Sequence, residues 1–283
     1  MCYPNLCLRS RVFSQRTPMT NNEKTSVAHW DSTWHGPSPF RHRTSLNVSI
    51  ADRRRMLAKE VAPGMRYLEI GCAPGLMLAY VARTLGAEVY GLDYSPVGIA
   101  QTRAVFDKLA LKAILRCEDV FSHTFPKDYF DVVHSGGVIE HFEDPREIVR
   151  IHVELLKPGG VALISIPHFS GLYGTIAAKT DPGNLAIHNR RIMNPASLQE
   201  LAPQNMCDSV SARPFGRISL SSVSFNSSRL LGLLAKGAAN TLGLLQPLTI
   251  ERLCPSLLLR IVRRPVFPRP ASSVRVQIQN RTS

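Results

Sequence analysis

One stretch of this chain, Tyr67 to Gly75, constrains its fold more than any other. It is an apolar run with Glu69 near its end, which breaks into a turn that carries two glycines. Apolar residues then recur at helical spacing from Leu76 to Thr84, so the pattern predicts a strand, a tight turn and a helix. Glycine has no Cβ and lets a ligand approach the backbone at the carboxyl end of a strand. We therefore expect a ligand at this turn.

The residues that follow repeat the alternation of strands and helices. Expected strands are 66–70, 88–92, 113–116, 130–135 and 161–166, and expected helices are 76–85, 96–109 and 145–156. Such alternation produces crossover connections and a parallel sheet, so the fold class is α/β. Further on, 195–202 and 230–258 read as helical, and 210–220 as a strand. Residues 273–280 alternate as an antiparallel edge strand does.

Several ordered motifs in this core resemble those of class I S-adenosylmethionine-dependent methyltransferases, in particular the quinone-biosynthesis type (methyltransferase type 11). They are the glycine turn with Ala73 at its middle glycine position, Asp93 after the second strand, Asp119-Val120 after the third, the block Phe130–Pro145, and the turn Leu155–Gly160. The resemblance implies a Rossmann-like fold with a mostly parallel seven-stranded sheet and a C-terminal antiparallel strand. It also implies an enzyme that moves a methyl group from S-adenosyl-L-methionine to a small molecule.

Asp93 is the sharpest cofactor candidate, because a carboxylate after the second strand can accept both hydroxyls of a ribose. Capping of the next helix is the alternative, although Ser95 before Pro96 is the better N-cap. The resemblance extends the cofactor-binding set to Glu69, Gly71, Cys72, Ala73, Gly75, Asp93, Tyr94, Asp119, Val120 and Ser135.

His141 is the candidate catalytic base, since an imidazole can accept the proton of an acceptor hydroxyl near neutral pH. Shaping of the pocket is the competing role. Some relatives bind a divalent cation through E-x-x-E-H, but here Gly137 occupies the first position. Glu140, His141 and His168 would be a poor ligand set for Mg²⁺, so we predict no metal.

Residues after the fifth strand are the expected source of acceptor contacts. His168, Tyr173, His188 and Arg190 are the candidates, with the guanidinium as a handle for a carboxylate or phosphate. The favoured reaction is O-methylation of a hydroxyl or carboxyl group in a biosynthetic pathway. An N- or C-methyltransferase of a small or lipophilic acceptor is the alternative, and a non-catalytic partner protein with the same fold is a further one.

The division of the chain follows from these motifs. Residues 1–28 are expected to be disordered, either an organelle-targeting segment or an over-extended reading frame that starts properly at Met19. Residues 29–62 would form an N-terminal helical lid with Trp30 and Trp34, unless these tryptophans only pack an apolar face. Residues 63–170 form the cofactor-binding core, and 171–283 hold an acceptor-side cap, a Leu-rich helical insertion, final strands and a basic tail.

The net charge of +13 is concentrated near the two ends of the chain. RNA binding is a third option, because the core has no aromatic and basic platform; an anionic membrane surface or an acidic partner suits the placement as well. The Leu-rich stretch 230–258 is too broken to span a membrane and could lie on its surface or pack on the sheet. Six cysteines without C-x-x-C spacing indicate a reducing compartment, so we expect a cytoplasmic or membrane-associated protein. The oligomeric state has no signal in the sequence.

Overall fold

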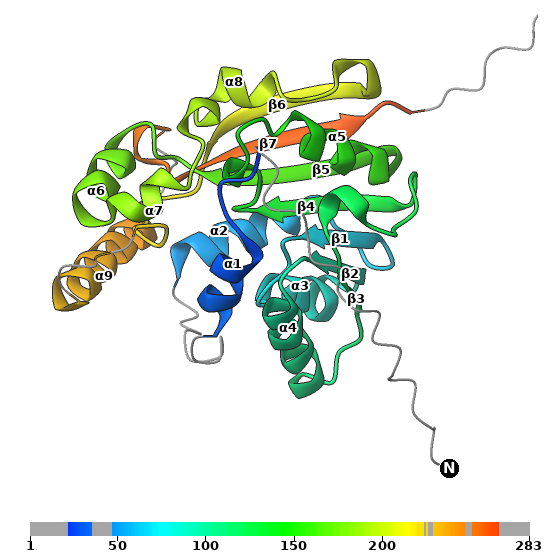
Figure 1. The fold of residues 1–283 in the computed structure, drawn as a ribbon, viewed down its shortest axis with the longest axis horizontal. Helices are drawn as coiled ribbons and strands as arrows, with labels where there is room; N and C mark the ends of the chain where they lie inside the picture. Colours follow the sequence, from blue (N-terminus) through cyan, green and yellow to red (C-terminus); the bar gives the residue numbers. More distant parts are fainter. Residues whose placement is uncertain (1–21, 36–46, 224, 226–228, 247–250, 266–283) are drawn as a thin grey trace, which may run out of the picture.

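The computed structural model describes residues 22–35, 47–223, 225, 229–246 and 251–265. They form a seven-stranded sheet in the order β3-β2-β1-β4-β5-β7-β6, with helices around it (Figure 1). The strands are β1 (Arg66–Ile70), β2 (Glu88–Asp93), β3 (Ile114–Cys117), β4 (Phe130–Gly136), β5 (Leu156–Pro167), β6 (Cys207–Phe215) and β7 (Ser256–Arg263). Among these strands, β7 alone runs in the direction opposite to the other six. The predicted fold class is confirmed.

Helices connect these strands and flank the site. The longer ones are α1 (Val27–Trp34), α2 (Val48–Leu57), α4 (Pro96–Lys108), α5 (Arg146–Leu155), α6 (Leu172–Thr180) and α9 (Arg229–Leu245). The shorter ones are α3 (Leu76–Tyr80), which continues as a π-helical turn Val81–Leu85, then α7 (Pro182–Ala186) and α8 (Pro195–Gln199). Single 3-10 turns lie at η3 (Val120–Ser122), η4 (Ile139–His141), η5 (Arg190–Ile192), η6 (Gln204–Met206) and η7 (Glu251–Leu253).

The core of the sheet is buried on both faces, as a parallel sheet requires. Along β1 the side chains alternate: Leu68 and Ile70 belong to one hydrophobic cluster and Tyr67 to the other. Along β4, Val133 and Val132 are divided in the same way. Successive side chains therefore lie on opposite faces of the sheet, and because both faces are buried these strands appear in the sequence as apolar runs.

The start of the chain departs from the prediction in two places. Residues 22–28 were included in a disordered segment, but Ser26 caps α1 and Glu23 forms a β-bridge with Phe142. Within the region 29–62, expected to be helical, the basic periodicity of 52–62 favours a helix there, but α2 begins after Asn47, whose side chain accepts from the amide of Ile50. The missed signal is the N-cap: an Asn before an apolar residue outweighed the basic periodicity. The question of Met1 or Met19 lies outside the described residues.

The end of the chain contains the largest error. The helical prediction over 230–258 is right for α9 but wrong at its end, because Glu251–Leu253 is a 3-10 turn and Ser256–Arg263 is the antiparallel strand β7. This strand lies between β5 and β6 and is covered on both faces. Its sequence therefore contains the apolar run Leu257–Leu259 and gives no alternating signal. The edge strand predicted at 273–280 lies outside the described residues.

Topology places the insertion after β6 at one particular edge of the sheet. Strands β1, β2, β4 and β5 are parallel, and β6 shares their direction because β7 runs antiparallel to both β5 and β6. Thus β6 ends, and β7 begins, at the carboxyl edge. The segment from Gly216 to Pro255, which contains α9, is therefore inserted at the edge where open α/β sheets bind ligands.

A buried ion pair fastens α2 to this insertion, and its loss should destabilise the fold. Asp52 is buried and accepts hydrogen bonds from the amide of Arg217 at 2.8 Å and from its Nε at 3.0 Å. Asp52→Asn should lower the free energy of unfolding by about 3 kcal/mol, because the guanidinium keeps its desolvation cost without the opposite charge. Chemical denaturation measures this value.

Glu147→Gln is the matched control, since Glu147 pairs with Arg150 on an exposed face of α5. Its effect should be about 0.5 kcal/mol or less. Equal effects of the two substitutions would contradict the structural role given to the buried pair.

Candidate functional site

A cavity opens at the carboxyl ends of β1, β2 and β4. It is walled by the glycine turn, by the residues after β2, β3 and β4, and by the N-terminal segment. The lining residues are Glu23, Thr25, Trp30, Trp34, Ile70, Gly71, Ala73, Leu92, Asp93, Tyr94, Glu118, Asp119, Val120, Gly136, Gly137, Val138, His141 and Phe142. Residues from distant parts of the sequence thus meet at one edge of the sheet.

The turn after β1 approaches the loop after β4 closely. Gly71 has φ of 71°, and a Cβ there would come within 2.5 Å of the Cγ2 of Val138. Only glycine satisfies both the positive φ and the contact. The backbone of this turn is consequently exposed to the cavity, as the sequence predicted.

Asp93 both supports the turn and faces the cavity. One carboxylate oxygen accepts from the amide of Ala73 at 3.1 Å and the other from the amide of Ser95 at 2.9 Å. Ser95 is the N-cap of α4, in agreement with the sequence analysis. Burial raises the pKa of Asp93 to about 6, although both amide hydrogen bonds lower it. Each oxygen keeps a lone pair for a ligand hydroxyl.

Asp119, Val120 and Tyr94, three members of the predicted cofactor-binding set, also line the cavity. Asp119 caps η3 by accepting from the amide of Phe121. Ser135 is different: it is fully buried, and its hydroxyl contacts Nε2 of His152 at 2.9 Å. The structure therefore keeps the Ser135 side chain away from the cavity.

A second, wider cavity adjoins the first and shares Gly71, Ala73 and Gly136 with it. Glu69, Cys72 and Gly75 line this part. The Oε2 of Glu69 is buried without a hydrogen-bond partner, while Oε1 lies 3.5 Å from Nδ1 of His134. An unpartnered buried carboxylate oxygen is costly unless a ligand supplies a donor, such as an ammonium group. Burial raises the pKa of the Cys72 thiol, which keeps it a packing group.

The N-terminal segment forms the outer wall. The amide of Lys24 donates to the carbonyl of His141 at 2.8 Å, and Trp30 donates through Nε1 to Thr25 at 3.1 Å. Helix α1 is also tied to α4, since the hydroxyl of Ser95 donates to Asp31 at 2.5 Å. Sequence reasoning missed Glu23–Thr25 because a short segment of polar residues carries no periodicity.

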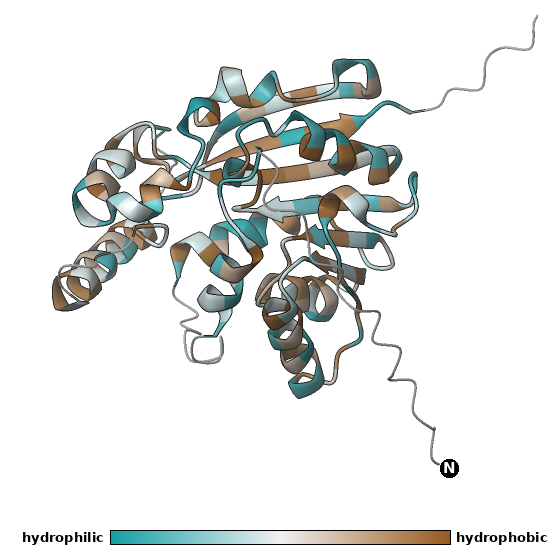
Figure 2. Ribbon diagram, viewed as in Figure 1, coloured by the Kyte–Doolittle hydropathy of each residue, from teal (hydrophilic) through white to brown (hydrophobic). Residues whose placement is uncertain are grey.

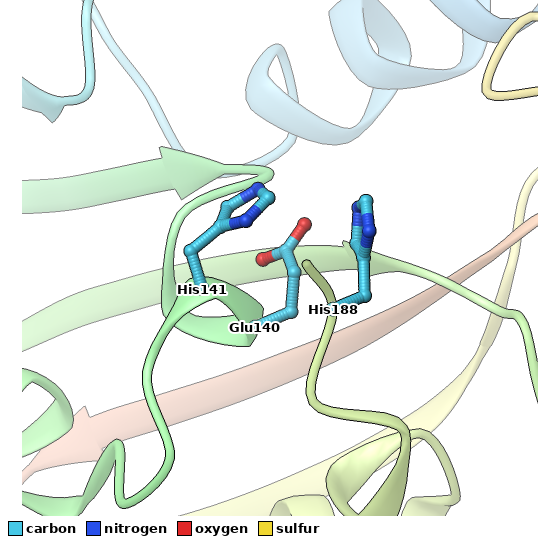
Figure 3. A group of neighbouring side chains, drawn as sticks. All are labelled: Glu140, His141 and His188. Atoms are coloured by element: carbon cyan, nitrogen blue, oxygen red, sulfur yellow. The ribbon is translucent and has the colours of Figure 1, made fainter. Parts of the chain in front are cut away.

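Three polar side chains gather at the wall of the cavity, which His141 lines: Glu140, His141 and His188 (Figure 3). Each offers one ligand atom, and these atoms lie within 4.8 Å of one another. The Nδ1 of His141 is 3.0 Å from the carbonyl of Ile187, and that of His188 is 2.6 Å from the carbonyl of Asn184. Donation to these carbonyls would place the proton on Nδ1 and the lone pair on Nε2 of both rings.

Burial controls the charge of this group. It raises the pKa of Glu140 to about 8, because Oε2 is buried without a partner. It lowers the pKa of His141 to about 3, with a smaller contribution from the nearby His188. Trp30 packs edge-on against the His141 ring at 5.0 Å. His141 is therefore a neutral imidazole on an apolar wall.

Asn189 brings the later loop to this position. It is buried, its amide donates to the carbonyl of Glu140 at 2.6 Å, and its Nδ2 donates to the carbonyls of Phe142 and Glu143. All three bonds join Asn189 to the loop after β4. Asn189 therefore fixes the neighbouring His188 beside Glu140. An isolated Asn gives no such signal in a sequence.

The other predicted acceptor contacts are distributed differently. His168 lies 3.1 Å through Nδ1 from the carbonyl of Cys254, and the Tyr173 hydroxyl donates to the carbonyl of Leu253 at 2.8 Å. Both link the segment after β5 to the start of β7 and line neither cavity. Arg190 is exposed at the start of η5. Of the four candidates, only His188 joins His141.

Comparison with known proteins gives one family. A family model described as a methyltransferase domain matches residues 40–207. A ubiquinone biosynthesis O-methyltransferase from Rhodopseudomonas palustris is 37% identical over 149 residues, covering 50% of this chain and 58% of that protein. A phosphoethanolamine N-methyltransferase from Triticum aestivum is 33% identical over 108 residues, covering 38% of this chain and 21% of that protein. The chain thus spans little more than half the length of the first of these relatives.

Solved structures share the fold at low identity. Phosphoethanolamine N-methyltransferase 2 of Haemonchus contortus with S-adenosyl-L-methionine has a TM-score of 0.53 and 18% identity, covering 78% of this chain and 52% of that chain. A methyltransferase of Archaeoglobus fulgidus has a TM-score of 0.54 and 20% identity, covering 79% and 96%. These likenesses bear on the fold alone.

The pKa of Asp93 predicts how cofactor affinity depends on pH. The carboxyl is neutral below pH about 6 and charged above it, and a charged carboxylate is the stronger acceptor for ribose hydroxyls. The dissociation constant of S-adenosylmethionine, measured by calorimetry, should rise about tenfold between pH 7 and pH 5. In Asp93→Asn it should be weak at both values. A wild-type affinity that stays constant over this range would contradict the role of Asp93.

The donor set of one carboxylate and two imidazoles fits a transition metal better than Mg²⁺. His188 replaces the His168 considered from the sequence. The prediction that no metal is bound remains open to a direct test. Metal analysis should find a substoichiometric content in the purified protein, and chelation should leave its thermal unfolding unchanged. A one-to-one metal whose removal lowers the melting temperature, with no such drop in Glu140→Gln, would overturn it.

Proposed function

This chain belongs to the methyltransferase domain family, and from that premise we propose that it is an enzyme that transfers a methyl group from S-adenosyl-L-methionine to a small molecule. The proposed reaction is O-methylation of a hydroxyl or carboxyl group in a biosynthetic pathway. The single observation that supports it best is the cavity in which Asp93, Asp119 and the glycine turn converge.

The residues present fit the cofactor at both of its ends. Asp93 has lone pairs for the ribose hydroxyls, and Asp119 with Val120, which line the same cavity, would contact the adenine. The buried, unpartnered Oε2 of Glu69 suits the ammonium group of the methionine part. When bound, S-adenosylmethionine would supply a methyl group on a sulfonium centre. The chain would contribute mainly by holding the acceptor in line with it.

His141 is proposed to accept the proton of the acceptor hydroxyl through Nε2. Its low pKa keeps the ring neutral and able to accept that proton, but it also makes His141 a weak base. Glu140, within 4.8 Å, would stabilise the imidazolium in its charged form, which prevails above pH about 8. The proton-accepting unit is thus Glu140 with His141, and His188 would border the acceptor.

The weak base favours one alternative, transfer to nitrogen. A neutral amine attacks the methyl group without prior loss of a proton, so a buried imidazole with a pKa of about 3 is sufficient beside it. The similarity to a plant phosphoethanolamine N-methyltransferase also supports transfer to nitrogen. C-methylation has no comparable support in the site.

The other sequence-based expectations for the working protein are part of the proposal. Helix α1 would act as the lid, since Trp30 and Trp34 line the cavity. We expect a cytoplasmic protein that contacts a membrane surface, where a lipophilic acceptor would be dissolved. Among the described residues, no helix has the length and apolar character needed to cross a bilayer.

Methyl transfer from labelled S-adenosylmethionine to a panel of phenols, carboxylic acids and amines tests the function. We expect labelled product from a phenol or carboxylic acid. His141→Gln should lower kcat for the hydroxyl acceptor about 100-fold and leave the affinity for the cofactor unchanged, because His141 would act on the acceptor alone.

His123→Gln is the matched control, since His123 lines neither cavity, and it should keep wild-type turnover. Full turnover of an amine by His141→Gln would favour N-methylation. Cofactor binding without transfer to any acceptor would contradict the proposal that the protein is an enzyme. Absence of cofactor binding would point to a non-catalytic partner protein.

A further inference from the structure

The leucines of α9 face away from the protein. Leu230, Leu231, Leu233, Leu234, Leu242, Leu244 and Leu245 are between 46% and 75% exposed. In a globular protein the apolar side of a surface helix faces the core. Here the order is reversed, and Figure 2 shows α9 as a largely hydrophobic helix at the outside of the molecule.

Small residues occupy the inner side of the helix. Gly232, Ala239 and Gly243 are buried, and a Cβ on Gly243 would collide with the carbonyl oxygen of Ile218. The helix is also fixed by polar bonds: Asn240 accepts from the amide of Val48 at 2.9 Å, and Gln246 accepts from the amide of Ile218 at 3.1 Å. The outward leucines are therefore a consequence of specific packing and do not reflect a loosely attached helix.

The width of the exposed face distinguishes between possible occupants. Adjacent leucines occur as pairs at 230 and 231, 233 and 234, and 244 and 245, so the face covers about half of the helix circumference. Helix pairing uses a narrow stripe, which would leave many of these leucines exposed. A helix that lies half-submerged in a fluid apolar phase buries such a wide face completely.

The charge of the sequence around α9 indicates which kind of apolar phase it would enter. The sequence from Ser209 to Ile250 contains no acidic residue and four basic ones. Arg217 is paired with Asp52, and the other three are Arg213, Arg229 and Lys236. Lys236 is half-buried on α9 itself, one turn after the buried Gly232, so it lies on the packed side of the helix and adds a positive charge behind the leucine face. Strand β7 ends on the side of the molecule opposite to α9 (Figure 1).

We propose that α9 docks this protein on an anionic phospholipid surface, lying in the plane of the interface with its leucine face among the acyl chains. The insertion that carries α9 is placed at the carboxyl edge of the sheet, so docking presents the edge with the candidate site to the membrane. The docking is independent of the proposed methyl transfer. Access of a lipophilic acceptor to the site is the part that depends on it.

Vesicle flotation tests the proposal with the full-length protein. Wild-type protein should float with vesicles of phosphatidylcholine and phosphatidylglycerol, and less with phosphatidylcholine alone. The triple substitution L230S/L234S/L245S should reduce binding at least about tenfold, because three exposed leucines would no longer enter the apolar phase. Lys236→Glu should weaken binding to the anionic vesicles only.

The matched control is Ile114→Ser, which removes an apolar side chain of similar exposure, 45%, from β3 at the far edge of the sheet. It should float like the wild type. Circular dichroism and the melting temperature confirm that each variant is folded. Calorimetry with S-adenosylmethionine should give the same affinity for wild type and triple variant, so failure of the cofactor assay and failure of docking are separate results.

Several results would overturn the proposal. The wild type could fail to float with either vesicle, or the triple variant could float as well as the wild type. A dimer that forms in solution without lipid and is lost in the triple variant would assign the leucine face to a second copy of this chain instead.

Discussion

The carboxylate of Asp93 is the contact on which the candidate site depends. It accepts the amide of Ala73 from the turn after β1 and the amide of Ser95 from the turn after β2. Two crossover turns are thereby held by one side chain, and the backbone of the glycine turn stays open to the cavity. Since the same oxygens are proposed to hold the ribose, the group that shapes the site is also the group that recognises the ligand.

Long-range ties complete the site on top of this local frame. Lys24 bonds the loop after β4 from the N-terminal side, and Asn189 bonds it from the segment after β5. The loop with η4 is therefore held from both directions, and this brings Glu140, His141 and His188 together. The sheet alone would position the cofactor, whereas the ties position the residues proposed to act on the acceptor.

Most of the core could be predicted from the sequence because each signal there is local. The bounds of β1 and the role of Ser95 as N-cap follow from neighbouring residues. The failures have physical reasons of two kinds. The strand β7 is an inner strand of the sheet, so its sequence is an apolar run that resembles the leucine-rich sequence of the helix before it. The meeting of His188 with His141 depends on Asn189, whose partners are distant in sequence and leave no pattern.

The outer wall made by residues 22–35 has a consequence for fragments of this protein. Every strand of the sheet lies after residue 65, so a fragment that starts at residue 36 would retain the complete sheet and its secondary-structure spectrum. It would nevertheless lack Trp30, Trp34 and the backbone hydrogen bond of Lys24, and the cavity would be open to bulk water. Circular dichroism would then not reveal that the wall is missing. A titration with a ligand would show whether the N-terminal wall of the cavity is present.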